Sequence, residues 1–183
     1  MQFIPTKFDA AWLLRIQPHP DMRGFFARTW CEEEFRHHGL CDRFVQCSVS
    51  FNEHEGTVRG MHLQMAPAEE VKIVRCTRGA IFDVIVDCRP GSATFGTWEA
   101  FYLNEDNHDA VYVPKGFAHG FQALATRTEV FYHISQFHDP ECARSFHYLD
   151  KDIGISWPKP VSVVSPKDKK AMAFATCSAE FQE

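Results

Sequence analysis

A single histidine, His62, lies in the apolar stretch "VRGMHLQ", which has the composition of a β-strand. A histidine in such a stretch is a buried structural side chain, a metal ligand or a proton-transfer base. Two further polar residues in apolar surroundings bear on the choice: Lys72 in "VKIVRC" and His119 in "VPKGFAHGF". Because an inward-facing lysine needs a reason, these residues predict a functional site.

The spacing of these residues resembles the metal-binding frame of a cupin-type double-stranded β-helix. That frame usually has His-x-His, then a glutamate separated by six residues from a glycine, then a later histidine after a Pro-x-Gly turn. Here His62 is followed by Gln64, Lys72 takes the glutamate position before Gly79, and His119 is the later histidine. A protonated lysine repels a divalent cation, so we expect no metal and no other cofactor.

Strand alternation tests whether these groups converge in the absence of a metal. In a regular strand, residues two apart point to the same face. By this rule each of three polar residues shares its face with apolar residues of its own run: Lys72, Tyr132 in "EVFYHIS" and His119. Polar groups in otherwise apolar rows are expected in the interior of a barrel. An ammonium and histidines in a barrel mouth indicate proton-transfer chemistry.

Arg59 and His62 are out of phase in a regular strand. They share a face only if the strand is irregular between them, and Gly60 is a natural site for a bulge. We therefore expect an irregularity at Gly60.

The elements that must position these residues are short. Turn signals such as "NEHEGT", "CRPGSATFG" and "FHDPEC" separate β-rich runs such as "FVQCSVSF", "AIFDVIVDC" and "AVYVP". Many short strands without helical patterns between them predict a sandwich or a barrel. The run "AIFDVIVD" alternates only partly, as a strand buried on both faces does.

Two short helices are predicted at the flanks. Thr29 and Glu32 form a capping-box pattern before "CEEEFRHH". Ser165, Pro166 and Asp168 have the pattern of a cap, a first-turn proline and an acidic third position before "KKAMAFA".

Composition limits the class of protein. The chain has 183 residues, which suits one domain. No window approaches 18 consecutive apolar residues, and the N-terminus lacks the pattern of a secretion signal. The net charge is -5 without a basic block, so we expect neither nucleic acid nor a membrane as a partner. Seven cysteines without a CxxC pair favour reduced thiols in the cytoplasm.

Eight stretches in order resemble the dTDP-4-dehydrorhamnose 3,5-epimerase family of nucleotide-sugar epimerases. They run from about residue 21 to 168: "DMRGFFARTW", "FVQCSVSFN", "GTVRGMHLQ", "VKIVRCTRGAIFDVIVDCRPGSATFGTW", "YVPKGFAHGF", "FYHIS", "DIGISWP" and "SPKD". The resemblance implies a single epimerase domain over residues 1–183. It also implies an all-β, jelly-roll or cupin-like double-stranded β-helix barrel with short flanking helices. The barrel is expected at about 40–140 and a C-terminal helical segment at about 166–175. A homodimer that needs no metal is implied as well.

The resemblance also implies residue roles. His62 matches the catalytic base and Asp168 its dyad partner. Tyr132 matches the acid on the opposite face of the sugar, and Lys72 matches the residue beside the C4 oxygen. The substrate-binding positions are matched by Arg23, Gln46, Arg59, His119, Phe137 and His138.

These residue types suit the implied reaction. A 4-keto sugar has acidified C–H bonds at C3 and C5, and a base that removes such a proton leaves an enolate. Histidine suits this step because its unperturbed pKa of about 6.5 lies near operating pH. A buried aspartate would orient the ring, and a lysine would stabilise the enolate oxygen. Inversion then requires a second proton donor on the other face.

Structural explanations compete with the functional ones. A lone strand histidine such as His62 is more often structural, and Asp168 could simply complete a helix cap. Tyr132 could be a core tyrosine with its hydroxyl at the rim, and Arg23 a plain turn residue. Gln46 has little signal of its own. The ordered match favours the catalytic interpretation over each of these.

The chain departs from the family pattern at two places. Cys47-Ser48 replaces a common Asp-Asn pair, which weakens one expected sugar or phosphate contact. Phe137-His138 replaces an aromatic pair of which one member stacks on the nucleotide base. The nucleotide therefore stays open between dTDP, CDP and GDP, and the sequence does not decide between C3, C5 or both.

Four hypotheses follow. The first is an epimerase of a nucleotide-linked 4-keto-6-deoxyhexose in deoxysugar biosynthesis, with dTDP as the default. The second is a monofunctional 3- or 5-epimerase of a CDP- or GDP-linked sugar. The third is a metal-dependent cupin isomerase or oxygenase, which Gln64 and Lys72 argue against. The fourth is a noncatalytic nucleotide-sugar binding module.

Overall fold

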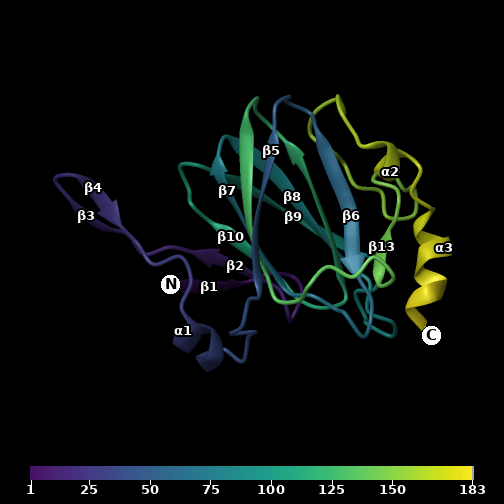
Figure 1. Ribbon diagram of the computed structural model, residues 1–183, viewed down its shortest axis with the longest axis horizontal. Helices are drawn as coiled ribbons and strands as arrows, with labels where there is room; N and C mark the ends of the chain where they lie inside the picture. The colour runs from purple at the N-terminus through teal and green to yellow at the C-terminus, as the bar shows by residue number, and fades with distance from the viewer. Residues whose placement is uncertain (183) are drawn as a thin grey trace.

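The computed structural model, which describes residues 1–182, consists mainly of two antiparallel sheets that face each other (Figure 1). The six-stranded sheet has the order β1 (Gln2–Pro5), β2 (Trp12–Arg15), β10 (Ala110–Val113), β7 (Lys72–Arg78), β12 (Thr128–Ile134), β5 (Gln46–Asn52). The five-stranded sheet has the order β13 (Ala143–Ser145), β6 (Val58–Gln64), β11 (Phe117–Ala123), β8 (Ala80–Asp87), β9 (Trp98–Asn104). This arrangement confirms the predicted jelly-roll, cupin-like barrel.

The sheets extend beyond the range expected for the barrel. β1 and β2 join the six-stranded sheet through the pairing of β2 with β10, and β13 pairs with β6. The barrel therefore begins near the N-terminus rather than at about residue 40. The sequence pattern missed this because β1 and β2 are only four residues long, too short to show alternation.

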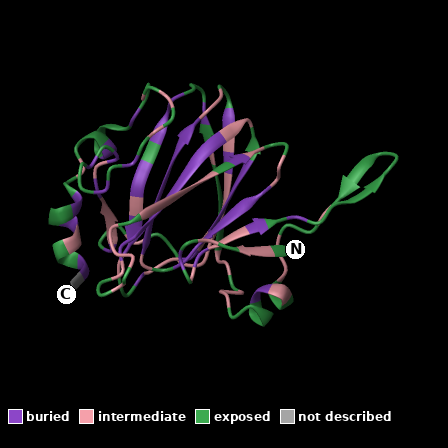
Figure 2. Ribbon diagram, turned by 180° about the vertical axis from the view of Figure 1, so that it is seen from behind, coloured by how far each residue is buried: buried purple, intermediate pink, exposed green. Residues whose placement is uncertain are grey.

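The barrel core lies between the two sheets. It includes Val74, Val130, Ile81, Ile85 and Phe121, which are at most 1% exposed. Burying a side chain of this size stabilises the fold by roughly 1.5–3 kcal/mol. Figure 2 shows the buried residues along the strands of both sheets, where this apolar core holds the sheets together.

Strand β8 is buried on both faces, as predicted. Its Ile81 and Ile85 belong to the barrel core, whereas Phe82, Val84 and Val86 belong to a second cluster. That cluster lies outside the sheet and includes residues of the C-terminal helices. The incomplete alternation of "AIFDVIVD" thus reflects a strand with a hydrophobic layer on each side.

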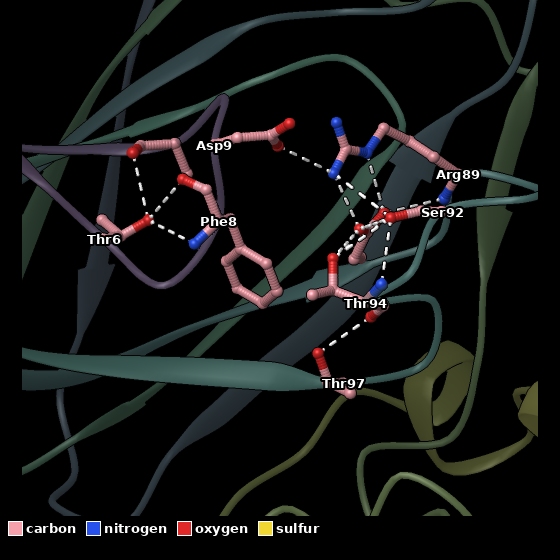
Figure 3. A network of polar contacts seen from close by, with 9 residues as sticks. Thr6, Phe8, Asp9, Arg89, Ser92, Thr94 and Thr97 are labelled. Carbon is pink, nitrogen blue, oxygen red and sulfur yellow. Dashed lines mark hydrogen bonds and ion pairs between the residues drawn. The ribbon is translucent and has the colours of Figure 1, made fainter.

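The loop after β8 is organised around one carboxylate. Asp87 is fully buried and accepts hydrogen bonds from the side chains of Arg89, Ser92 and Thr94, which lie together in Figure 3. Burial opposes ionisation of Asp87, but these hydrogen bonds outweigh it and lower its pKa to about 2. The network fixes the turn of "CRPGSATFG" against the barrel.

A hairpin extends away from the barrel. Its strands, β3 (His19–Asp21) and β4 (Gly24–Phe26), are exposed along their length (Figures 1 and 2). Met22 at its turn is fully exposed, and Phe26 is 75% exposed. An exposed apolar hairpin of this kind is typical of a segment that another surface covers.

The first flanking helix does not begin as predicted. Helix α1 (Glu32–His37) has Cys31 at its N-cap and no side-chain cap, so the capping box of Thr29 with Glu32 is wrong. Burial of Phe35, which is 0% exposed, anchors the helix instead. Tertiary packing therefore moved its start past the local capping signal.

The C-terminal helical segment is split in two. Ser165 caps α2 (Pro166–Lys169) by accepting a hydrogen bond from the Asp168 amide, as predicted. The helix ends at Lys169 rather than continuing to 175, because the chain pairs Met172 with Phe146 before α3 (Phe174–Ala179) and the 3₁₀ turn η1 (Glu180–Gln182). Within residues 1–182, no helix is long and apolar enough to cross a membrane.

Candidate active site

A cavity of about 810 Å³ lies between the two sheets. Its volume is in the range of sites that enclose a small organic ligand. Side chains from β5, β6, β7, β11, β12 and α2 line it. Eight of the ten predicted site residues are among them: Gln46, Arg59, His62, Lys72, His119, Tyr132, His138 and Asp168.

His62 and Asp168 form a hydrogen-bonded pair. Nε2 of His62 lies 2.7 Å from Oδ1 of Asp168, although the residues are 106 positions apart. The aspartate is 3% exposed, whereas the His62 side chain is 43% exposed toward the cavity. The other carboxylate oxygen accepts from the Gly60 amide at 3.5 Å. This geometry holds one ring nitrogen of His62 and leaves Nδ1 to meet a ligand.

Asp168 combines the two roles that compete for it. Its backbone amide donates to Oγ of the capping residue Ser165, and its carboxylate contacts His62. Burial raises the pKa of this carboxyl group, but the hydrogen bond and charge of His62 outweigh burial, so the pKa lies below its ordinary value. Asp168 is thus an anion that orients the ring and stabilises an imidazolium.

Gly60 allows Arg59 and His62 to face the same cavity. The register of β6 against β11 shifts between the pairs His119 with His62 and Phe121 with Arg59, so β6 has one extra residue there. Gly60 has φ +120°, and a Cβ on it would lie 2.6 Å from the Cα of Gly120. The predicted irregularity at Gly60 is confirmed.

Tyr132 reaches the cavity from the six-stranded sheet. It pairs in register with Ser48 on β5 and Val74 on β7, and its hydroxyl lies 3.5 Å from Oγ of Ser50. Burial raises the pKa of the Tyr132 phenol well above its ordinary value. The residue is therefore a neutral phenol that can donate a proton.

Lys72 forms an ion pair that the sequence analysis missed. Its Nζ lies 2.8 Å from Oε1 of Glu70, and each side chain is 12% exposed. Both line the cavity. The available signal was the Glu-x-Lys spacing, which places an acid and an ammonium on one side of an extended chain.

A second histidine–carboxylate pair lies deeper in the barrel. Nε2 of His119 is 2.7 Å from Oδ2 of Asp83, and the residues are 5% and 0% exposed. The other oxygen of Asp83, Oδ1, has no hydrogen-bond partner within the described residues. Asp83 was also missed, and its signal was a charged residue inside "AIFDVIVD".

Several cationic side chains belong to the lining of the cavity. Arg59 donates through Nε to Oδ1 of Asn52 at 2.7 Å and through Nη2 to the Phe51 carbonyl at 3.1 Å, which orients its guanidinium plane. Lys167 and Arg144 also line the cavity, and sequence analysis did not single them out. Such cations suit a phosphate-bearing ligand.

Two predicted site residues lie outside this cavity. Arg23 is on the β3–β4 hairpin, pairs with Asp21 and has an 85% exposed side chain. Phe137 is 62% exposed, and its hydrogen bonds involve only its backbone: its amide donates to Oε1 of Gln136 at 2.9 Å, and its carbonyl accepts from Nε2 of Gln64 at 3.2 Å. The prediction that these two side chains meet the site therefore fails within one protomer, because each is carried on a segment directed to solvent.

The residue at the second metal-ligand position has a structural role. Nε2 of Gln64 also donates to the Ala68 carbonyl at 2.9 Å, and its Oε1 accepts from the Asp139 amide at 2.7 Å. The amide is thus fully used in tying loops to β6. Within residues 1–182, no three His, Cys, Asp or Glu side chains are grouped to hold a metal ion.

A histidine–aspartate pair, a tyrosine and a lysine thus line one cavity together with further cationic side chains. Such a set can remove a proton from a carbon acid, stabilise the resulting enolate and return a proton from another side. Fold and site together are those of a jelly-roll isomerase.

Comparison with known proteins identifies the family. The sequence model of the dTDP-4-dehydrorhamnose 3,5-epimerase family matches residues 5–176, and the chain belongs to that family. The protein is therefore a sugar-nucleotide epimerase of deoxysugar biosynthesis, as the motifs predict.

Three relatives illustrate the similarity. The chain is 39% identical to a dTDP-4-dehydrorhamnose 3,5-epimerase of Sinorhizobium fredii, over 100% of this chain and 94% of the relative. It is 34% identical to a dTDP-4-dehydrorhamnose 3-epimerase of Streptomyces niveus, over 96% and 84%. The crystal structure of the 3,5-epimerase from Legionella pneumophila in complex with dTDP-4-keto-L-rhamnose superposes with a TM-score of 0.92, at 36% identity over 98% and 96% of the two chains.

Proposed function

We propose that this enzyme inverts C3, C5 or both in a dTDP-linked 4-keto-6-deoxyhexose through an enolate intermediate. The observation that carries the proposal is the placement of His62 on β6 and Tyr132 on β12, which belong to opposing sheets of the barrel. A base and an acid on opposite walls of one cavity can act on opposite faces of a sugar ring. Inversion requires that arrangement.

The reaction uses four side chains. His62 takes a proton from the carbon next to the C4 ketone, and the C–H electron pair moves into the ring to form the enolate. Asp168 stabilises the imidazolium through its 2.7 Å hydrogen bond. Lys72 donates a hydrogen bond to the negative C4 oxygen. Tyr132 then donates its proton to the same carbon from the other face, and solvent exchange resets both groups.

The diphosphate is held by the cationic side chains of the cavity lining. Arg59 presents an oriented guanidinium, and Lys167 and Arg144 add charge. Gln46 and His138 line the same cavity and contact the sugar and the base in this proposal, with His119 on the sugar side. No cofactor takes part. The dTDP assignment rests on the substrates named for the relatives.

We also propose that the enzyme folds as one epimerase domain and works as a homodimer in the cytoplasm. Phe26 on the hairpin and Val49 on the sheet-edge strand β5 are 75% and 55% exposed, and a second copy would cover such surfaces. In such a dimer the hairpin would carry Arg23 to the cavity of the partner subunit. Phe137 would lie within reach of a site that the two protomers share. The seven free cysteines support a reducing compartment. Gel filtration with light scattering tests the dimer, and a monomer at assay concentration would contradict it.

Incubation with 4-keto-6-deoxyhexoses linked to dTDP, CDP and GDP in D₂O, followed by NMR, tests the proposed function. We expect deuterium at C3, C5 or both of the dTDP sugar, with inverted product and no loss of activity on addition of a chelator. Exchange at C3 alone would establish a 3-epimerase, the activity named for the Streptomyces niveus relative. Absence of exchange with every sugar, or exchange that survives in His62→Asn, would overturn the proposal.

A further inference from the structure

Glu70 occupies an unusual place in the cavity. It lies two residues before Lys72, the first residue of β7, and its Oε1 is 2.8 Å from the lysine Nζ. The two carboxylates that line the cavity are Glu70 and Asp168, and Asp168 is already engaged by His62. Glu70 is therefore the lining carboxylate that is available to Lys72.

The position of the Lys72 ammonium depends on this contact. A lysine side chain has a flexible four-carbon stem, so its ammonium can adopt many positions. Arg59 and Lys167 line the same cavity, and like charges that share a cavity repel one another. The Glu70 contact opposes that repulsion and restricts the rotamers of Lys72.

We propose that Glu70 is a positioning residue that holds the Lys72 ammonium toward the substrate's C4 oxygen; this inference rests on the proposed function. An ammonium has three N–H donors, so a carboxylate that pairs with it on one side leaves donors for the enolate oxygen. A donor that is held in place before the reaction needs no reorganisation as the negative charge develops. Glu70 therefore acts on kcat more than on KM.

A graded set of variants tests this role. Glu70→Ala removes the acceptor, and we expect kcat to fall about tenfold with KM within about twofold. Glu70→Gln keeps an acceptor oxygen for the ammonium but loses the charge, and we expect its kcat to lie between those of Glu70→Ala and wild type. An unchanged kcat in Glu70→Ala, or a kcat of Glu70→Gln as low as that of Glu70→Ala, would overturn the inference.

A double-mutant cycle separates positioning from a general structural effect. If Glu70 acts through Lys72, Glu70→Ala should not lower the deuterium exchange rate further in a Lys72→Met background. The same fold loss in both backgrounds would show that Glu70 acts by another route and would contradict the proposal.

A matched control is available outside the cavity. Glu55 and Lys159 form an ion pair with the same 2.8 Å Nζ–Oε1 distance, so Glu55→Ala should leave kcat unchanged. A tenfold loss of kcat in that control would remove the support for Glu70. Inactive wild-type protein would count against the proposed function, whereas active wild type with a fully active Glu70→Ala variant would count against this inference alone.

Discussion

His62 and His119 are direct cross-strand partners on β6 and β11, and each forms a 2.7 Å hydrogen bond to a buried aspartate. Asp168 comes from α2 and Asp83 from the neighbouring strand β8. His62 is partly open to the cavity, whereas His119 is 5% exposed. The exposed pair therefore has the access that a base requires, and the buried pair forms the wall behind it.

Tyr132→Phe should separate proton exchange from inversion. The variant keeps His62 and Lys72, so the enolate still forms and its proton still returns from the His62 side. We expect deuterium exchange within about tenfold of wild type, with inverted product reduced about 10²-fold or more. NMR in D₂O measures both quantities in one sample.

Tyr112→Phe is the matched control for Tyr132→Phe. Tyr112 is also a buried tyrosine, but its hydroxyl lies outside the cavity and accepts a hydrogen bond from the Cys41 amide. Its inversion rate should stay at the wild-type level. Loss of exchange together with inversion in Tyr132→Phe would show that Tyr132 is needed for enolate formation and not only for reprotonation.

Asp168→Asn should impair catalysis far more than stability. The amide cannot supply the negative charge that stabilises the His62 imidazolium, so we expect kcat to fall about 10²- to 10⁴-fold. Ser165→Ala removes the helix cap and should cost about 1 kcal/mol of unfolding free energy with kcat within a few fold. Steady-state kinetics and urea unfolding compare the two variants. Equal kinetic losses would indicate that Asp168 acts mainly through the helix.

Gly60→Ala should destabilise the barrel and displace the site. A Cβ at this position lies 2.6 Å from Gly120 Cα and 2.9 Å from the His119 carbonyl oxygen, and φ is +120°. Backbone strain of this type costs about 1–3 kcal/mol, and the contacts with backbone add to it. Thermal unfolding should show a lower Tm, and kcat/KM should fall.

Gly91→Ala is the control for Gly60→Ala, because Gly91 also has a positive φ, +75°, but an added Cβ meets nothing within 4 Å. Its kcat/KM should match that of wild type. Equal effects of the two substitutions on kcat/KM would show that the close approach of β6 to β11 does not matter for the site.

Asp87→Asn should show a pH-dependent loss of stability. Asp87 has a pKa of about 2 in the folded protein, against an ordinary value of 3.8. At pH values above 3.8 its carboxylate therefore contributes about 2 kcal/mol to the free energy of unfolding. That contribution disappears as pH falls from about 4 through about 2. The difference in unfolding free energy between wild type and variant should therefore be largest at neutral pH and shrink in acid.

Urea unfolding at several pH values measures this difference. Asp9→Asn is a suitable comparison, because Asp9 pairs with the same Arg89 at 3.4 Å but its side chain is 87% exposed. Its effect should be small at every pH. A difference for Asp87→Asn that stays constant between pH 7 and pH 3 would contradict the assignment.

Short-range patterns were sufficient for much of the barrel. Alternation placed Lys72, Tyr132 and His119 on inward-facing rows, and Gly60 indicated the bulge that brings Arg59 to the same wall. These predictions succeed because the two-residue period of a strand is a local property. The helix cap at Ser165 succeeds for the same reason.

Other features depended on residues that are distant in the chain. Burial of Phe35 overrode the capping signal at Thr29, and the bridge from Met172 to Phe146 divided the C-terminal helical segment. The sequence also could not show that the hairpin carries Arg23 away from the cavity of its own protomer. Local patterns contain no information about such contacts.

The sequence by itself determined the class of barrel and the residue types of the site, because strand period and ordered motifs are encoded locally. Only the tertiary structure decided the partners: Asp168 with His62 across 106 positions, Asp83 with His119, and Glu70 with Lys72. Each is a hydrogen bond or an ion pair, and its existence depends on ångström-scale distances that the packing of two sheets and a terminal helix sets.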